Sequence, residues 1–500
     1  MHACVKTVAF FGISTVEVDV QVQILNGMPS FSIVGLPDKA VAESRERIRS
    51  SLYSMGISLP AKRITVNLAP ADVQKEGSHY DLPIALALLV AMEILSQEDI
   101  VNVLAIGELS LIGGLSKVPG VLPAALCAQS HNNIFICPAE CAQEAAWAGD
   151  KAILAPKTLT ALLNHFKGQQ LLPRITPDKS QVRSDWIPTF GCFSDIKGQI
   201  VAKRALEIAA AGSHNVLMSG PPGVGKSMLA SRIPGILPPM TSKESLEVTM
   251  IHSMAGMMDN CGLIMQRPYR SPHHSASLVA LVGGGNNAKP GEVSLAHNGV
   301  LFLDELPEFS RMALESLRQP LETGDITIAR ANNHVTYPAR IQLIAAMNPC
   351  KCGYMGVPEK ECSRAPRCGQ DYLRKLSGPL LDRIDIFIDV PVVKLQDYYQ
   401  DKSQLETSDV IRQRVIKARK IQYDRYGEGK TNAEASGTDM ERYLSDEARR
   451  MLLAFVDKSK VSARGFYRIL KLARTLADCS ESDSIQKEHI AESIEYRTGY

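Results

Sequence analysis

The segment Gly220-Pro-Pro-Gly-Val-Gly-Lys-Ser227 constrains this chain more than any other feature. It matches the pattern G-x-x-x-x-G-K-[ST], and it lies between an expected strand at 215–219 and an expected helix at 228–232. Glycines let backbone N–H groups converge on phosphate oxygens, and the start of the helix adds partial positive charge. The alternative is a glycine-rich turn with a chance Lys-Ser pair, but the flanking elements favour a phosphate site. The residues expected to hold a nucleotide are Gly220, Pro221, Pro222, Gly223, Val224, Gly225, Lys226, Ser227 and Met228.

A second apolar run, 300–303, ends in Asp304 and Glu305. A strand buried on both faces reads as a continuous apolar run, and its carboxyl end opens at the ligand crevice of a parallel sheet. We therefore expect Lys226 to bridge the β- and γ-phosphates of ATP, and Ser227 and Asp304 to hold Mg²⁺. Glu305 is expected to orient and deprotonate the attacking water.

A third apolar run, Ile341–Met347, ends in Asn348. An amide at the same crevice could position the water or sense the γ-phosphate. The alternative is an asparagine that caps a turn before Pro349. The spacing alone leaves both interpretations open.

Composition sets the class of protein. With 45% hydrophobic and 22% charged residues, the 500-residue chain is typical of globular proteins and long enough for about two to four domains. A formal charge of +2 neither demands nor excludes nucleic acid. No run approaches the length of a membrane span, and the first residues lack the pattern of an export signal. The 11 cysteines are therefore expected to be reduced thiols in a cytoplasmic protein.

Changes in pattern along the chain predict three structured regions. Residues 1–167 alternate short strands and helices, and 168–190 read as a linker rich in proline and polar residues. Residues 191–400 form a second α/β region, and 401–500 are helical. In the first region we expect strands at Val16–Leu25 and Arg63–Leu68 and helices at Lys39–Met55 and Pro83–Ile94.

Several long runs resemble the ComM/YifB family of magnesium-chelatase-like AAA+ ATPases. They are GPPGVGKS, VLFLDE, AAMNPCKCG and LSGPLLDRIDI, with FSIVGLPDKAVAESRERI and VNLAPADVQKEGSHYDLPIALAL nearer the N-terminus. The resemblance covers nearly the whole chain. It implies an α/β protein with three parts. The N-terminal domain would be a ribosomal-S5-type α/β domain like that of Lon protease, and a P-loop AAA+ core with a parallel sheet and a C-terminal helical lid would follow.

The resemblance also implies roles for single residues. Asn348 would be sensor 1, the residue that senses the γ-phosphate. Arg464 resembles the sensor 2 arginine of the lid, which closes on the phosphates of the nucleotide. Arg383 looks like the arginine finger that reaches the nucleotide of a neighbouring subunit, so the family implies a homo-hexameric ring. The alternative for Arg383 is a salt bridge within the chain, to Asp382 or Asp385.

Two segments are candidates for DNA contact. Residues 270–298 are glycine-rich and polar, unlike a core helix, and resemble the insert that AAA+ helicases project into their central pore. They include the pair His273 and His274, either structural or near the nucleotide. Residues 326–340 read as a β-hairpin of the kind that touches DNA in related ring motors. Its candidate contacts are Arg330, Asn332, Asn333 and His334, and the alternative is an exposed polar turn.

Four cysteines follow Asn348 closely: Cys350, Cys352, Cys362 and Cys368. Four thiolates can hold one tetrahedral Zn²⁺ and fold an otherwise loose insert, 350–368. The spacing C-x-C-x₉-C-x₅-C departs from the commoner C-x₂-C pairs, so reduced free cysteines are the alternative. Four cysteine ligands would leave no open position, so the expected role is structural.

The Lon-like region lacks the Ser–Lys dyad of Lon. The family pattern puts Asp81 or a neighbour near the nucleophile position and Ala124 at the lysine position. Ser78 and Lys117 do not match those places. We expect no peptidase activity, and we expect this region to form a second ring tier. Its polar residues Lys62, Arg63, Lys75 and His79 are candidates for guiding DNA, and the alternative is that they form a solvated face.

The function that the resemblance implies is an ATP-driven motor that migrates branched recombination intermediates and promotes integration of incoming DNA during natural transformation. Its expected cofactors are ATP, Mg²⁺ and a structural Zn²⁺. Its expected partners are single-stranded, forked or branched DNA and recombination proteins, with no membrane. The alternatives are a motor subunit of a magnesium chelatase and a Lon-like protein unfoldase.

Overall fold

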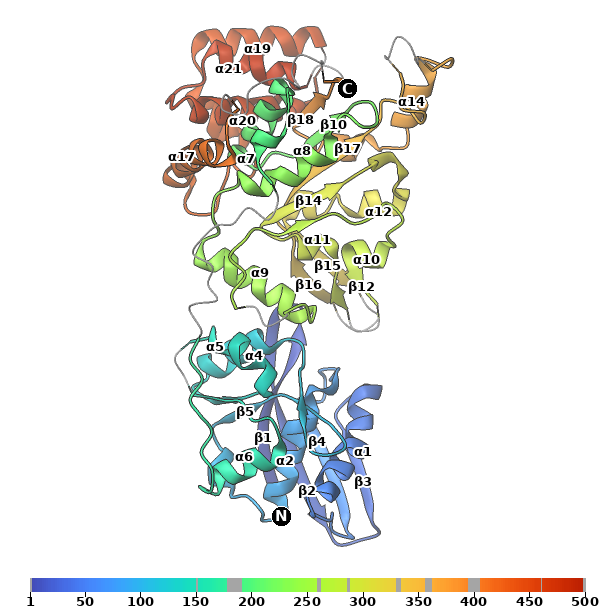
Figure 1. Cartoon of the computed structure of the whole chain (residues 1–500), viewed down its shortest axis with the longest axis vertical. Coiled ribbons are helices and arrows are strands. Elements are labelled where there is room, and N and C mark those ends of the chain that lie inside the picture. The colour runs from blue at the N-terminus through green and yellow to red at the C-terminus, as the bar shows by residue number, and fades with distance from the viewer. Residues whose placement is uncertain are drawn as a thin grey trace.

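The computed structural model describes residues 2–149, 152–177, 191–258, 262–285, 288–329, 334–355, 362–393, 405–459 and 461–497. Two α/β units lie one above the other along the long axis, and a helical unit flanks the second (Figure 1). Within these ranges, no helix combines the length and the apolar character needed to cross a membrane.

The N-terminal unit is built on a seven-stranded mixed sheet with the order β3-β4-β2-β1-β5-β8-β9. The long pair β1–β2 is antiparallel, whereas β5, β8 and β9 run parallel to β1. Helix α2 is buried at every position against this sheet, as its unbroken apolar sequence predicts. The strands are β1 (His2–Phe11), β2 (Ser14–Leu25), β3 (Ser30–Val34), β4 (Arg63–Ala69), β5 (Val103–Ala105), β8 (Ile134–Ile136) and β9 (Ile153–Leu154). The main helices are α1 (Lys39–Ser54), α2 (Asp81–Ala91), α4 (Val121–Ser130), α5 (Ala142–Ala146) and α6 (Leu159–Phe166).

The second unit carries a five-stranded parallel sheet with the order β11-β14-β17-β10-β18. The four residues of β10 and the five of β14 are all buried, which explains their continuous apolar sequences. The expected α/β fold with a parallel core sheet is thus confirmed. The strands are β10 (Val216–Ser219), β11 (Tyr269–Arg270), β14 (Gly299–Leu303), β17 (Ile341–Met347) and β18 (Ile386–Asp389). Helices α7 (Ile200–Gly212), α8 (Lys226–Arg232) and α9 (Ser242–Met254) flank the sheet.

The C-terminal unit is helical, as predicted. It contains α17 (Ser408–Tyr426), α18 (Gly437–Met440), α19 (Asp446–Ser459), α20 (Ala463–Cys479) and α21 (Lys487–Glu495). Helices α17 and α20 both pack on α7. Asp478 is buried between them and pairs with Arg425 at 2.7 Å and with Arg474 at 2.8 Å. Buried charges paired in this way fix the helices to each other, because removal of one partner would leave the other uncompensated.

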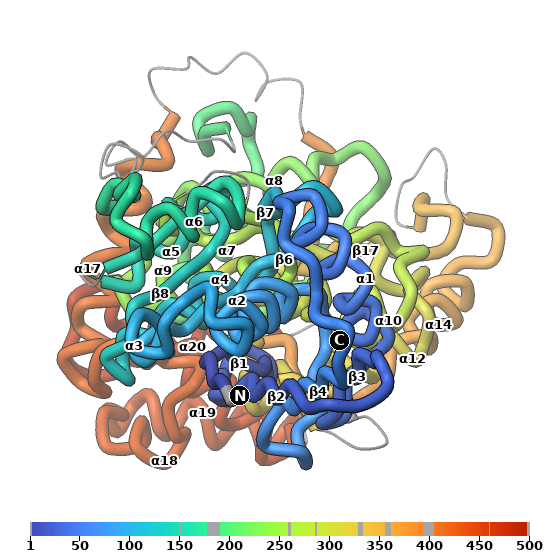
Figure 2. Tube along the Cα trace, turned by 90° about the horizontal axis from the view of Figure 1, so that it is seen from below, coloured from blue at the N-terminus to red at the C-terminus, as the bar shows by residue number. Residues whose placement is uncertain are grey.

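Among the described residues, the two α/β units meet at the α4–α9 contact and at the turn between β1 and β2. Helix α4 packs on α9, where the backbone N–H of Gly120 donates to the carbonyl of Ser253 at 3.1 Å. The turn between β1 and β2 meets the hairpin of β15 (Asp325–Ala329) and β16 (His334–Pro338). A Cβ on Gly12 would lie 2.3 Å from the Thr336 carbonyl oxygen, so only glycine fits there. Figure 2 views this arrangement from below, with the N-terminal unit in front.

Candidate nucleotide-binding site

The glycine-rich turn joins the buried strand β10 to helix α8, as the sequence predicts. Gly223 and Gly225 have φ of +80° and +96°, which favour glycine, and space is open around both. A Cβ on Gly220 would lie 2.3 Å from the carbonyl oxygen of Val390, so the turn is packed closely against the residue after β18. The turn therefore has the backbone that a phosphate cradle needs.

Lys226 is the first residue of α8, and its side chain is buried within this turn. Its ammonium Nζ donates to the carbonyl of Gly220 at 2.6 Å, to that of Pro221 at 2.9 Å and to Asn348 Oδ1 at 3.1 Å. Burial lowers the pKa of Lys226, while the charges of Asp304 and Glu305 act to raise it. These neutral carbonyl and amide oxygens accept the hydrogen bonds of the Lys226 ammonium that the phosphate oxygens of a nucleotide would accept.

The two acids lie directly after β14, beside the turn. Ser227 Oγ donates to Asp304 Oδ2 at 2.8 Å, and the backbone N–H of Glu305 donates to Asp304 Oδ1 at 2.9 Å. A hydroxyl and a carboxylate in contact are oxygen ligands of the type that Mg²⁺ takes in phosphate-transfer sites. The pair therefore fits the expected metal.

Asn348 directly follows β17, which lies between β10 and β14 in the sheet. Its contact with Lys226 places it in the same crevice as the phosphate turn. The structure thus brings together the lysine, the serine, the first acid and the amide from three neighbouring strands. Met228 lies in the first turn of α8 with 45% of its surface exposed.

Arg383 lies elsewhere. It precedes β18, and the side-chain amide of Asn215 donates to its carbonyl at 2.9 Å. Asn215 precedes β10, whereas Lys226 follows it. Arg383 therefore lies at the amino ends of the parallel strands and Lys226 at their carboxyl ends. The four residues of β10 separate those ends by about 13 Å. The backbone of Arg383 therefore lies at the opposite end of the strands from the phosphate turn of its own chain.

The Arg383 guanidinium pairs with Glu322 and donates to the carbonyl of Pro379 at 2.7 Å. The partner is thus neither Asp382 nor Asp385, the two acids that the sequence suggested. Asp385 is buried and pairs with Arg468 instead. Arg383 lowers the pKa of Glu322, and the charge of Arg464 adds to that effect.

Arg464 is exposed at the start of α20. Of the two arginines expected to act on a nucleotide, Arg383 thus pairs with Glu322, and Arg464 lies near enough for its charge to act on the same carboxylate.

The cysteine cluster packs beside the site. Cys350 and Cys352 have their sulfurs 3.1 Å apart, and those of Cys350, Cys362 and Cys368 all lie within 4.8 Å of one another. Tetrahedral Zn–S bonds of about 2.3 Å require sulfurs about 3.8 Å apart, so Cys350, Cys362 and Cys368 have a spacing that suits a zinc ion. Cys352 lies beside Cys350 but outside this group of three. All four are free thiols in the described structure.

The loop after Asn348 also contacts the phosphate turn directly. Gly353 has φ of +84°, and a Cβ placed on it would lie 2.8 Å from Pro222 Cδ. The loop that carries Cys350 and Cys352 therefore packs directly on the phosphate turn.

The expected pore insert is more ordered than its composition suggests. It contains helices α10 (Leu278–Val282) and α11 (Glu292–Leu295) and a two-stranded hairpin of β12 (Gly283–Gly284) and β13 (Lys289–Pro290). Leu281 and Val293 are buried in the core, so the expectation that the segment is unlike a core helix is wrong at these two positions. Leu281 belongs to the short apolar run 278–282, which forms α10.

The hairpin β15–β16 forms as predicted, with Ile328 paired to Val335. Of its candidate DNA contacts, Arg330, Asn332 and Asn333 lie outside the described residues. His334 begins β16 and is exposed.

The N-terminal unit holds no Ser–Lys pair at the expected places. Ser78 Oγ contacts Glu108, and Lys117 Nζ reaches across to the carbonyl of Met258 in the second unit. Asp81 is buried and accepts from Arg47 at 2.6 and 2.9 Å. Ala124 is fully buried in α4.

The suggestion that Lys75 and His79 face DNA or solvent is wrong, because both are buried. Lys75 donates to the carbonyl of Pro70, and His79 Nε2 lies 2.9 Å from that of Val8. Lys62 and Arg63 are exposed, as expected. Burial lowers the pKa of His79 to about 4.

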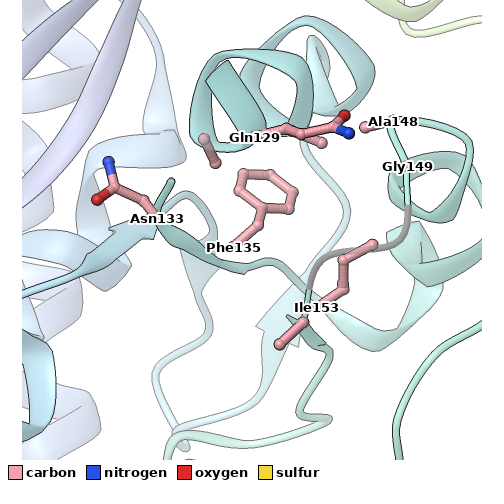
Figure 3. Close-up of a pocket in the computed structure, with 9 residues that line it drawn as sticks. Gln129, Asn133, Phe135, Ala148, Gly149 and Ile153 are labelled. Carbon is pink, nitrogen blue, oxygen red and sulfur yellow. The ribbon is translucent and has the colours of Figure 1, made fainter. Parts of the chain in front are cut away.

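A cavity beneath α4 is too small for a substrate. Its volume is about 10 Å³, close to one water-sized sphere. Figure 3 shows the Phe135 ring at its centre, with Asn133 directed away from it.

The partner of Arg383 could not be predicted from the sequence, because Glu322 carries no motif signal. The sequence leaves His273 and His274 either structural or near the nucleotide. The pairing of β11 with β14 places His274 3.5 Å from Glu305, the candidate general base.

Comparisons with known proteins agree with this arrangement. The family "Magnesium chelatase, subunit ChlI" matches residues 192–398, and its C-terminal counterpart matches 405–497. "Subunit ChlI of Mg-chelatase" matches residues 20–141.

Full-length relatives were found as well. The chain is 44% identical to the competence protein ComM of Haemophilus influenzae, over 99% of this chain and 97% of that protein. It is 42% identical to YifB of Salmonella typhimurium over the same shares, and 40% identical to Rv2897c of Mycobacterium tuberculosis over 98% and 97%. The chain therefore belongs to the ComM/YifB family of magnesium-chelatase-like AAA+ ATPases.

Proposed function

We propose that this protein is an ATP-driven DNA motor that migrates branched recombination intermediates. The observation that carries the ATPase part is the contact of Lys226 with Asn348 beside the Ser227–Asp304 pair. Three strands of one sheet deliver these groups to a single crevice, which suits a magnesium-bound triphosphate. Glu305, the next residue, is the proposed general base.

The DNA part of the proposal is supported by the full-length likeness to a protein named for competence. Its structural support is the pair of hairpins β12–β13 and β15–β16. They lie side by side, since a Cβ on Gly283 would be 2.9 Å from Ile328 Cδ1. Two short hairpins on one face of each subunit would line the pore of a ring. His334 and the exposed Lys289 would face the phosphates there.

A ring is supported by the position of Arg383 and Arg464. Since Arg383 lies at the other end of the strands from Lys226, it would act on the nucleotide of a neighbouring subunit. Arg464, whose charge acts on the same Glu322, would act there with it. A homo-hexamer is the assembly we propose. The N-terminal unit, without a Ser–Lys dyad among its described residues, would form a second tier with no peptidase activity.

The test is strand exchange on a synthetic four-way DNA junction, with ATP turnover measured in parallel. We expect the junction to stimulate turnover and the wild type to move the branch point. Both effects should fall steeply as salt rises, because phosphate contacts release counterions. A protein that hydrolyses ATP but neither responds to junctions nor moves them would rule out the DNA motor.

The family match to a magnesium-chelatase subunit favours one alternative, a motor for metal insertion. Mixing the protein with protoporphyrin, Mg²⁺ and chelatase partner subunits distinguishes it. Insertion of the metal would support the alternative. Casein digestion by the wild type, lost in Lys226→Ala, would instead support a Lon-like unfoldase with protease activity.

We also propose that the cysteine cluster holds one structural Zn²⁺. The expected result is one zinc per chain by elemental analysis, lost on Cys368→Ser. Because Gly353 packs on Pro222, loss of the metal should also weaken ATP binding, by about 10-fold if it costs roughly 1.4 kcal/mol. Cys4→Ser, which lies in the N-terminal sheet, is the matched control and should keep its zinc. A zinc-free wild type with full ATP affinity would contradict the assignment.

A further inference from the structure

The N-terminal unit carries a cluster of metal-ligating side chains, far from the phosphate turn in sequence. Cys127 lies in helix α4 and His131 caps the end of that helix, four residues later, so both lie on one face of it. Glu17 reaches the same point from strand β2. One ligand atom of each residue, a sulfur, a nitrogen and an oxygen, lies within 4.8 Å of the other two.

The separations of these atoms suit a tetrahedral metal ion. His131 Nδ1 lies 3.7 Å from Cys127 Sγ and 3.4 Å from Glu17 Oε1. Zn–S bonds of about 2.3 Å and Zn–N and Zn–O bonds of about 2.0–2.1 Å, at tetrahedral angles, place nitrogen about 3.6 Å from sulfur and about 3.3 Å from oxygen. The observed distances are close to these values, so the ligands need little movement to bind a zinc ion.

The same geometry argues against a cysteine nucleophile. In a relay of thiol, imidazole and carboxylate, the thiol and the carboxylate contact different nitrogens of the ring. Here Cys127 and Glu17 both contact Nδ1 of His131, so the three groups converge on one point. Burial also raises the pKa of the Cys127 thiol, whereas a nucleophilic cysteine needs a lowered one. A bound metal ion would deprotonate the thiol by its own charge, with the proton released to water.

Neighbouring groups orient the carboxylate and the ring. Lys6 Nζ lies 3.2 Å from Glu17 Oε2, the oxygen that does not contact His131. Asn133, which points away from the small cavity in Figure 3, donates to Glu17 Oε1 at 3.3 Å. His131 Nδ1 also lies 3.0 Å from the carbonyl oxygen of Cys127, and with a metal ion on Nδ1 the ring proton would reside on Nε2. Outer partners of this kind fix the ligands of metal sites.

We propose that Glu17, Cys127 and His131 form a binding site for a divalent transition-metal ion, with Zn²⁺ as the best match. A thiolate and an imidazole suit zinc, whereas Mg²⁺ and Ca²⁺ take oxygen ligands. Three protein ligands leave a fourth position for water or a small ligand. The His131 side chain is 52% exposed, so the ion can enter from solvent.

This site should bind zinc more weakly than four thiolates do. It has one ligand fewer, and the charge of Lys6 beside Glu17 opposes a cation. We therefore expect it to lose its ion on dialysis against a chelator, which would leave only the zinc proposed for the four-cysteine cluster.

The test is calorimetric titration of Zn²⁺ into the dialysed full-length protein. We expect the wild type to bind one equivalent more than His131→Ala or Glu17→Ala. Each of these variants should bind that equivalent at least about 100-fold more weakly, because loss of an outer partner alone costs roughly 10- to 100-fold. Cys4→Ser removes another thiol of the same sheet and is the matched control, expected to bind like the wild type. The difference between variants is one equivalent whether or not the four-cysteine cluster holds its own ion.

Co²⁺ in place of Zn²⁺ reports the sulfur ligand. A thiolate bound to Co²⁺ gives a charge-transfer band in the near ultraviolet, and Cys127→Ser should remove the part of this band that His131→Ala also removes. Circular dichroism identifies any variant that fails to fold, and His131→Ala, at an exposed position, then carries the test. Equal zinc binding by the wild type and His131→Ala would overturn the proposal, as would an equal loss in Cys4→Ser or a Co²⁺ spectrum unchanged by Cys127→Ser.

Discussion

Replacing Arg383 with alanine is expected to lower ATP turnover by about 10³-fold or more, the value of an arginine finger, while ATP still binds. The reason is its position. Arg383 lies at the amino ends of the parallel strands, whereas Lys226 lies at their carboxyl ends. Removal of the Arg383 side chain therefore leaves the phosphate turn of its own chain intact. A guanidinium from a neighbouring subunit would stabilise negative charge on the transferring phosphate.

Mixing experiments separate this role from a structural one. Arg383→Ala and Lys226→Ala are each expected to lose turnover alone, but a ring containing both would place some intact Lys226 sites next to subunits that retain Arg383. We expect measurable turnover in the mixture. Glu322→Gln is a useful control, because it removes the charge that holds Arg383 within its own chain. It should keep turnover. If mass spectrometry shows that the rings contain both variants and ATP turnover still does not recover, action between subunits is contradicted.

The second large effect is expected for Lys226→Ala. The ammonium makes three contacts with oxygens at 2.6–3.1 Å, all of which phosphate oxygens would replace. Its loss removes a positive charge from a buried site where charge develops, so turnover should fall by on the order of 10³-fold. Steady-state turnover at saturating Mg²⁺ measures this effect. Lys203→Ala, a lysine of α7 outside the crevice, is the control and should keep turnover. Turnover near the wild-type value would contradict the assignment of the site.

Much of the nucleotide site could be predicted because it depends on short-range patterns. An apolar run followed by glycines and Lys-Ser encodes a strand, a turn and a helix within about fifteen residues. The same holds for the acids after β14 and the amide after β17. Parallel pairing brings the ends of these strands together, so the contact between Lys226 and Asn348 follows from the fold class once it is known.

The remainder depends on contacts between segments far apart in the sequence. Arg383 has two acids nearby in the chain, Asp382 and Asp385, yet it pairs with Glu322, 61 residues away. Asp385 is taken by Arg468 of the lid. Charge alone cannot choose among such partners. In the N-terminal unit, Lys75 and His79 have sequence neighbours typical of a surface, but the fold buries both.

The most direct test of the central claim is calorimetric titration of ATP with Mg²⁺ into three proteins: the wild type, Glu305→Gln and Lys226→Ala. If Lys226, Ser227 and Asp304 form one site for a magnesium-bound triphosphate, the wild type and Glu305→Gln bind with similar affinity, and Lys226→Ala binds at least about 10-fold more weakly, a difference of about 1.4 kcal/mol. Equal affinity of all three proteins, or no binding by the wild type, would contradict it.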